Sequence, residues 1–231
     1  MTTHTRRLLE VSDFISMRIP MQYRSVLPEK MQRVTYATPP SLLAQFGPVV
    51  TQDAAKFMIR FRDLTVNKVP AFRGRGLLFY GESGVGKTAL ACWLLAQLRA
   101  WIPRSSALFT TVPDLYGAYR EPWKSEQVTR EENLHQRLSS VQFLVIDGLA
   151  PLASHHLGFT AEALRMLVDT RNQGNRATFI TTAMTPEEIQ QELPEIASLS
   201  YVMPVEVEGE DLRHPAEDKA RELLLAELLT D

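Results

Sequence analysis

The sequence predicts an α/β fold in which helices pack on both faces of a parallel sheet. Apolar runs of strand length alternate along the chain with helical patterns, which is typical of parallel β-α-β units. A glycine-rich stretch of the form G-x-x-x-x-G-K-T joins one such strand to a helix. The chain has 231 residues, which suits one well-buried core and is short for two domains.

The glycine-rich stretch is a P-loop, the motif that binds the phosphates of a nucleoside triphosphate. An apolar run at 77–80 precedes it and a helix-forming stretch at 89–96 follows it, which is the context that the motif requires. Its glycines let successive backbone N–H groups point at one phosphate, and the helix N-terminus adds its positive end. The predicted nucleotide-binding residues are Gly81, Glu82, Ser83, Gly84, Val85, Gly86, Lys87 and Thr88. We expect Lys87 to reach the outer phosphates and the Thr88 hydroxyl to hold Mg²⁺.

The composition predicts a soluble, cytoplasmic protein with no membrane association. Apolar residues make up 45% of the chain and charged residues 23%, as in ordinary globular proteins. The start of the chain lacks the apolar run of a signal peptide, and no run approaches membrane-spanning length. The one cysteine, Cys92, excludes an internal disulfide and a zinc site of several thiolates, and its apolar helix favours a packed thiol.

Charge is unevenly distributed along the chain. Residues 1–75 hold 12 Lys and Arg against 5 Asp and Glu, whereas residues 76–231 hold 13 against 22. The basic part therefore lies before the P-loop. This asymmetry favours contact with nucleic acid or with an acidic protein surface, and a solvated surface with no partner is the alternative.

The chain before the P-loop reads as an arm followed by a helix. A short amphipathic helix is expected within residues 1–16, with an apolar side made of Leu8, Leu9, Val11 and Ile15. Prolines at 20, 28, 39 and 40 keep the next segment irregular, which predicts a strap over the core. A second helix is expected at 51–64. We therefore divide the chain into a basic arm and strap at 1–50, a nucleotide-binding core at 51–214, and a C-terminal helix at 215–231 that closes the domain or docks a partner.

The elements after the P-loop helix continue the α/β alternation. A strand is expected at 107–111, a short helix at 114–119, and a polar helix at 125–138. Between these helices, Trp123 lies in a loop beside basic residues, where it either stacks on a nucleic-acid base or anchors the loop to the core. A helix at 160–172, a buried strand at 177–182, a helix that starts at Thr185 and a short strand at 205–207 complete the core.

The run at 141–147 is apolar and ends in Asp147, as in a strand buried on both faces. Ligands of parallel sheets bind beyond the carboxyl ends of the strands. Asp147 at that end can meet the Mg²⁺ held by Thr88, so these two residues are the predicted metal site. The alternative is a buried strand that happens to end in Asp.

In order and spacing, these motifs resemble the AAA+ ATPases, and within them the helicase loaders of the DnaC/DnaI kind and the transposition helper ATPases of the IstB kind. Besides the P-loop and the Asp147 strand, the resemblance rests on the stretches 19–24, 111–115, 178–182 and 209–213, and it covers about residues 18–214. It implies a three-layer P-loop NTPase fold of AAA+ type, with a five-stranded parallel sheet in the order 5-1-4-3-2, a short N-terminal helical arm and a C-terminal helix.

The resemblance also implies roles for three further residues. Thr181 or Thr182 would be the polar sensor that positions a water near the γ-phosphate, and Arg213 would be a second sensor. Together with Asp147 these residues form the predicted catalytic set. The alternatives are a threonine pair that satisfies the backbone at its own strand end and a surface arginine.

Two departures from the family's pattern concern hydrolysis. The family usually carries an acidic residue directly after the Asp that corresponds to Asp147, to activate the attacking water, but this chain has Gly148. The segment that normally supplies an arginine finger is here 196–202, and it contains no Arg. Arg171 or Arg176 could act in its place, although we do not favour this. The sequence therefore predicts ATP·Mg²⁺ binding with slow hydrolysis, if any.

The predicted function is a nucleotide-switched helicase loader in DNA replication, acting as a homo-oligomer with the replicative helicase and DNA, the latter single-stranded. An IstB-like transposition helper, whose partner is a transposase, is the first alternative. A non-hydrolysing ATP-bound scaffold is the second. A small-molecule kinase is disfavoured, because no cluster of arginines follows the fourth strand to build a lid over the phosphates. The pair His155 and His156 is expected to be solvated.

Overall fold

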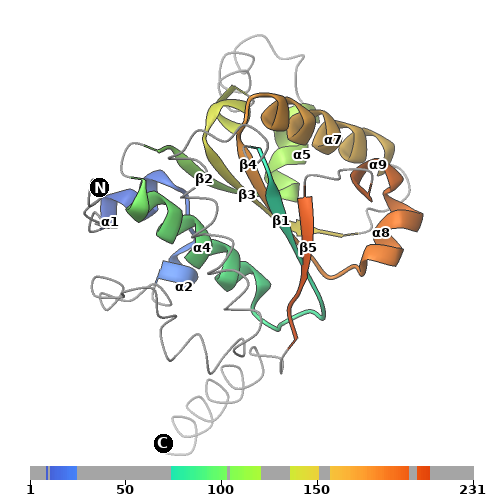
Figure 1. Ribbon diagram of the computed structural model, residues 1–231, viewed down its shortest axis with the longest axis horizontal. Helices are drawn as coiled ribbons and strands as arrows, with labels where there is room; N and C mark the ends of the chain where they lie inside the picture. The colour runs from blue at the N-terminus through green and yellow to red at the C-terminus, as the bar shows by residue number, and fades with distance from the viewer. Residues whose placement is uncertain are drawn as a thin grey trace, which may run out of the picture.

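The computed structural model describes residues 9, 11–24, 74–102, 105–120, 136–150, 157–197 and 202–208. Five strands form one parallel sheet in the order β2-β3-β4-β1-β5 (Figure 1). The strands are β1 (Gly76–Tyr80), β2 (Ala107–Thr111), β3 (Phe143–Leu149), β4 (Ala177–Thr182) and β5 (Val202–Glu206). This order confirms the predicted one, read from the opposite edge of the sheet.

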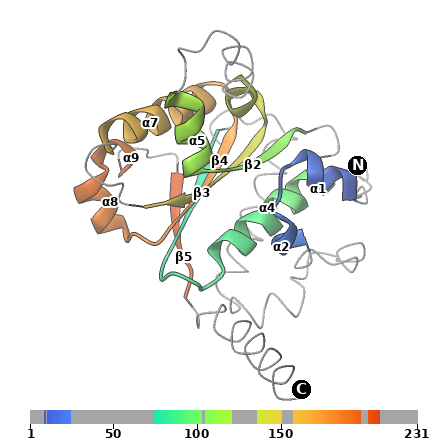
Figure 2. The ribbon, with the colours of Figure 1, turned by 180° about the vertical axis from the view of Figure 1, so that it is seen from behind.

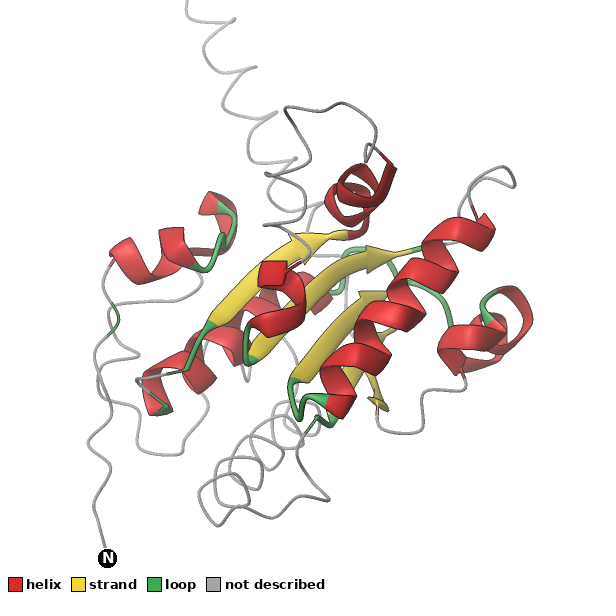
Figure 3. Cartoon of the chain, turned by 90° about the horizontal axis from the view of Figure 1, so that it is seen from above, coloured by secondary structure: helices red, strands yellow, loops and turns green. Residues whose placement is uncertain are grey.

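Helices cover both faces of this sheet. On one face lies α4 (Lys87–Trp101), with α1 (Val11–Ser16) and α2 (Met21–Arg24) beside it (Figure 1). On the other face lie α5 (Val112–Arg120), α7 (Leu157–Gln173), α8 (Pro186–Glu192) and α9 (Pro194–Ala197), as the view from behind shows (Figure 2). Figure 3 shows the sheet between the two layers of helices. The predicted three-layer α/β fold is confirmed.

Alternation along the strands divides the buried side chains between two cores. On β1, Leu77 and Phe79 face α4, whereas Leu78 faces the α7 layer. The strands are buried on both faces because each face carries helices, which explains why their sequences read as continuous apolar runs. In the described part of the chain, no helix combines the length and apolar character needed to cross a membrane.

Gly76 sets the close approach of β1 to β4. A Cβ atom at this position would lie 1.7 Å from the backbone oxygen of Thr178, so no other residue fits without moving a strand. The tight contact holds β1 against β4, and the loop after β1 begins from that fixed position.

The described N-terminal segment belongs to the core that faces α4. Met17 and Ile19 are fully buried there, and the backbone oxygen of Met17 accepts a hydrogen bond of 2.8 Å from the N–H of Phe109 on edge strand β2. The prediction that Ile15 belongs to the apolar side of the first helix is wrong, because this residue is 57% exposed. The reason is that α1 has only six residues, and the chain enters the core just after it ends.

Most expected element boundaries in the described residues agree with the structure. Helix α8 has the expected N-terminus, with a capping box between Thr185 and Glu188 and a proline at its first position. The last strand, Val202–Glu206, begins three residues earlier than expected, because its register with β1 pairs Val202 with Gly76. Several expected features lie outside the described residues: the helices at 51–64 and 215–231, most of the helix at 125–138, Trp123, His155 and His156.

A fully buried arginine joins α7 to the starts of β3 and β4. The Arg171 guanidinium donates hydrogen bonds to the backbone oxygens of Leu138, Val141 and Ala177 and to the hydroxyl of Thr178. Burial, together with the nearby charge of Arg176, lowers the pKa of Arg171 to about 9. The guanidinium is therefore still charged at neutral pH, and backbone oxygens accept most of its hydrogen bonds.

We expect Arg171→Met to lower the free energy of unfolding by about 3 kcal/mol, because it leaves several buried carbonyl groups without a donor. Urea denaturation measures this change. The control is Arg165→Met on the same helix, whose 2.9 Å ion pair with Asp169 is partly exposed and whose loss should cost less than about 1 kcal/mol. Equal effects of the two substitutions would contradict the assigned role of Arg171.

Candidate nucleotide-binding site

The loop between β1 and α4 has the backbone geometry of an anion site. Gly84 and Gly86 both have a φ of 94°, a left-handed conformation that glycine adopts without strain. Gly86 is the N-cap of α4 and provides no side-chain hydrogen bond to the helix. The first N–H groups of a helix have no partner within it, so those of α4 are oriented towards a ligand beyond its N-terminus.

Lys87 lies along this loop. Its ammonium group donates hydrogen bonds of 2.8 Å to the backbone oxygen of Gly81 and 2.5 Å to that of Glu82. The side chain is only 9% exposed. The charge therefore lies within the turn that the glycines form, where it can meet the phosphates of a nucleotide.

Thr88 and Asp147 meet at the carboxyl end of the sheet. The Thr88 hydroxyl, in the first turn of α4, donates a hydrogen bond of 2.6 Å to Oδ1 of Asp147 on β3. The two residues are 59 positions apart in the chain. Hydroxyl and carboxylate oxygens are ligands that Mg²⁺ accepts, and the structure brings the two predicted metal ligands together.

Of the two candidate sensors on β4, only Thr181 reaches this group. The Thr181 hydroxyl donates a hydrogen bond of 2.6 Å to the same Oδ1 of Asp147. The Thr182 hydroxyl instead donates to the backbone oxygen of Leu149 and accepts from the N–H of Met184. Neighbouring residues of a strand point to opposite faces, so only one of the pair can face Asp147. Thr182 therefore fits the alternative interpretation, in which a threonine at a strand end only satisfies nearby backbone groups.

Among the described residues, the other candidates do not extend the site. Arg213 lies outside the described residues. Arg171 is fully buried, so it cannot reach a neighbouring molecule. Gly148, beside Asp147, is exposed. Cys92 is buried, and both its burial and the nearby charge of Asp147 raise its pKa, in agreement with the expected packed thiol.

The residues present fit a magnesium–nucleotide complex. In the described ranges, no three or more His, Cys, Asp or Glu side chains gather closely enough to hold a metal by themselves. Mg²⁺ commonly binds through one or two protein oxygens and completes its shell with phosphate and water. Thr88 and Asp147 would hold the ion, and the α4 N-terminus and Lys87 would hold the phosphates that share it.

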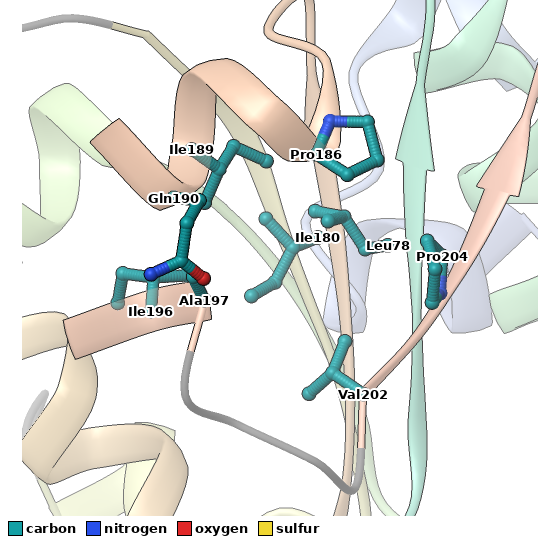
Figure 4. A pocket seen from close by; sticks show the side chains of 9 residues that line it. All are labelled: Leu78, Ile180, Pro186, Ile189, Gln190, Ile196, Ala197, Val202 and Pro204. Carbon is teal, nitrogen blue, oxygen red and sulfur yellow. The ribbon is translucent and has the colours of Figure 1, made fainter. Parts of the chain in front are cut away.

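An apolar pocket of about 170 Å³ lies elsewhere, between the sheet and helices α8 and α9 (Figure 4). Its lining comes from β1, β4, α8, α9 and β5, and Gln190 is the most polar residue in it. Its lining residues on β1 and β4, Leu78 and Ile180, face away from α4. Without a charged side chain in its lining, this pocket does not fit a phosphate.

Sequence reasoning missed the backbone conformation at Gly148, which has a φ of 82°. It considered this position only as one that lacks an acid. One local signal was available, because Asp-Gly is a dipeptide that marks turns and Gly readily adopts positive φ. No local sequence pattern indicated the hydrogen bonds of Arg171, since the residues that accept them lie outside its own helix.

Comparisons with known proteins agree with the fold. Residues 77–205 match the ATPase family associated with various cellular activities (AAA). No curated protein matches the sequence.

Solved structures with the same fold include proteins of DNA replication. A crystal structure of DnaI has a TM-score of 0.56 at 20% identity, over 83% of this chain and 96% of that one. The DnaC helicase loader has a TM-score of 0.53 at 20% identity, over 70% and 92%. A replication initiator DnaA bound to AMPPCP and single-stranded DNA has a TM-score of 0.50 at 16% identity, over 68% of this chain, which spans only 49% of that protein. At these identities the likeness shows the fold alone.

We expect Lys87→Met to weaken ATP binding at least thirtyfold, which corresponds to about 2 kcal/mol for a partly buried charge contact. Isothermal titration with a non-hydrolysable ATP analogue measures the affinity. Arg137→Met removes an equal charge from an exposed position and is the control. Unchanged affinity in the folded Lys87→Met protein would contradict the assigned place of the phosphates.

Proposed function

This chain belongs to the AAA family of ATPases, and from that premise we propose that it is a nucleotide-switched helicase loader of DNA replication. It binds ATP with Mg²⁺ at the loop Gly81–Thr88, and occupancy of the loop controls its contact with the replicative helicase and with single-stranded DNA. Self-association of the chain is part of the proposal. The single observation that carries ATP·Mg²⁺ binding is the convergence of Thr88 and Asp147 beside the glycine loop.

Slow hydrolysis is part of this proposal, because two groups that the family uses to promote it are absent from their usual positions in the sequence. The position after Asp147 is Gly148, which has no side chain to activate a water. An arginine finger contributes a factor of about 10³ to 10⁵ in related NTPases. The segment 196–202 contains no arginine, and Arg171 is bound to backbone oxygens inside the fold. The binding groups are therefore complete, while the hydrolytic groups are not.

The choice of helicase loading rests on the fold likeness to DnaI and the DnaC helicase loader. The likeness to a DnaA structure that contains single-stranded DNA supports the DNA partner. The basic charge of residues 1–75 suits contact with a phosphate backbone. A transposition helper of the same family would instead bind a transposase.

A non-hydrolysing ATP-bound scaffold is the second candidate function, and the glycine at position 148 favours it. A scaffold and a switch share the same nucleotide site. They differ in whether ATP and ADP lead to different assemblies, because a ligand shifts an equilibrium only through different affinities for its two states.

We expect steady-state phosphate release well below the turnover of about 1 s⁻¹ that marks the low end of typical enzymes. The measurement uses the purified chain with ATP and Mg²⁺, and Lys87→Met as the background. Turnover of about 1 s⁻¹ or more that Lys87→Met abolishes would contradict slow hydrolysis.

We also expect the replicative helicase of the native host to bind the immobilised chain with ATP and to bind it at least tenfold more weakly with ADP. The Asp147→Asn variant, which lacks a predicted metal ligand, should bind the helicase equally well with ATP and with ADP. Binding of a transposase in place of the helicase would favour the transposition helper. Equal helicase binding in ATP and ADP by the unaltered chain would favour the scaffold.

A further inference from the structure

Strand β3 contains one extra residue next to Asp147. Ile146 pairs with Ile180 on β4 and Leu149 pairs with Thr182, so three steps on β3 match two on β4. This is the count of a β-bulge. The bulge also changes which face the strand presents, because Ile146 and Leu149 both pack in the core beside α7 although they are three residues apart.

Gly148 lies in this bulge and has a left-handed backbone, with a φ of 82°. A Cβ atom built at Gly148 would meet no other atom within 4 Å. The space around this position could therefore hold a side chain. What requires glycine here is the backbone conformation and not the lack of room.

The backbone N–H of Gly148 is hydrogen-bonded to a residue of the candidate site. It donates a hydrogen bond of 3.0 Å to the Thr181 hydroxyl, which in turn donates to Oδ1 of Asp147 at 2.6 Å. A hydroxyl has one proton. Because Thr181 accepts from the amide and gives its proton to the carboxylate, the chain of bonds has a fixed direction and ends on the oxygen that also accepts from Thr88.

We propose that Gly148 is a positioning residue of the magnesium site, which holds the Asp147 carboxylate towards Thr88 through its left-handed backbone and the Thr181 hydroxyl. Position 148 then has a role of its own that requires glycine, besides lacking the acidic residue that the family usually carries there. An L-residue other than Asn or Asp is strained at this φ, so a glutamate at 148 would disturb Asp147 without acting as a water-activating base. This inference rests on the proposed binding of ATP·Mg²⁺.

Three substitutions at position 148 and one elsewhere separate backbone from side-chain effects. Gly148→Ala adds only strain, since its Cβ meets nothing. Gly148→Asn tests rescue, because Asn tolerates the left-handed conformation. Gly148→Glu supplies the acid that the family usually carries. Gly117→Ala is the matched control, because a Cβ there also meets nothing within 4 Å but the backbone is helical.

The main measurement is the affinity for a non-hydrolysable ATP analogue with Mg²⁺ and with EDTA. We expect Gly148→Ala and Gly148→Glu to reduce the gain in affinity from Mg²⁺ about tenfold, in keeping with the cost of a strained left-handed residue. Their affinity in EDTA should be unchanged, because the glycine loop and Lys87 are intact. Gly148→Asn and Gly117→Ala should keep the full Mg²⁺ effect, and Gly148→Glu should not raise phosphate release.

A full Mg²⁺ effect in folded Gly148→Ala would overturn the proposal, and so would faster phosphate release by Gly148→Glu. A second measurement does not need nucleotide. We expect Thr181→Val to speed amide hydrogen exchange at Gly148 about tenfold in NMR spectra of the nucleotide-free chain, and an unchanged rate would also overturn it. If the unaltered chain binds no nucleotide, the proposed function fails, while the exchange experiment still decides whether the Gly148 hydrogen bond exists.

Discussion

The candidate site depends on the contacts that the Asp147 carboxylate makes with two hydroxyl groups. One of its oxygens accepts hydrogen bonds from Thr88 on α4 and from Thr181 on β4, and so joins three elements that are far apart in the chain. These hydroxyls can reach it only if β3 and β4 are neighbours and α4 begins at the same edge of the sheet. The strand order and the direction of the strands meet both conditions. The carboxyl ends of parallel strands lie together, which is where ligands of such sheets bind.

The two cores give this contact a rigid support. Helix α4 is buried along most of its length, with Leu90, Leu94 and Leu98 fully enclosed. Its position therefore cannot change without disturbing the packing against β1, β3 and β4. Gly76 keeps β1 close to β4, so the start of the glycine loop and the candidate sensor strand are held together. Binding groups placed on such elements need little reordering to receive a ligand.

The buried polar groups of the candidate site lie apart from those that only support the fold. Arg171, which also donates to the Thr178 hydroxyl, satisfies backbone oxygens at the amino ends of the strands, while Thr181 and Asp147 lie near the carboxyl ends. Thr182 lies at the carboxyl end of β4 but has a structural role like that of Arg171, since its hydroxyl donates to the backbone oxygen of Leu149 on β3 and accepts from the N–H of Met184. The family resemblance left open which of the two threonines is the sensor, and only Thr181 points towards Asp147.

The sequence by itself determined the class of fold, and it predicted the glycine loop and the pair Thr88 and Asp147, because each depends on local pattern. Glycine spacing, apolar runs and an acid at a strand end are visible within a few residues. Only the tertiary structure decided which threonine faces Asp147, that Arg171 is internal, that the 11–24 segment enters the core, and that Gly148 has a left-handed backbone. These features depend on contacts between residues distant in the chain and on strand pairing, whose partners no local pattern specifies.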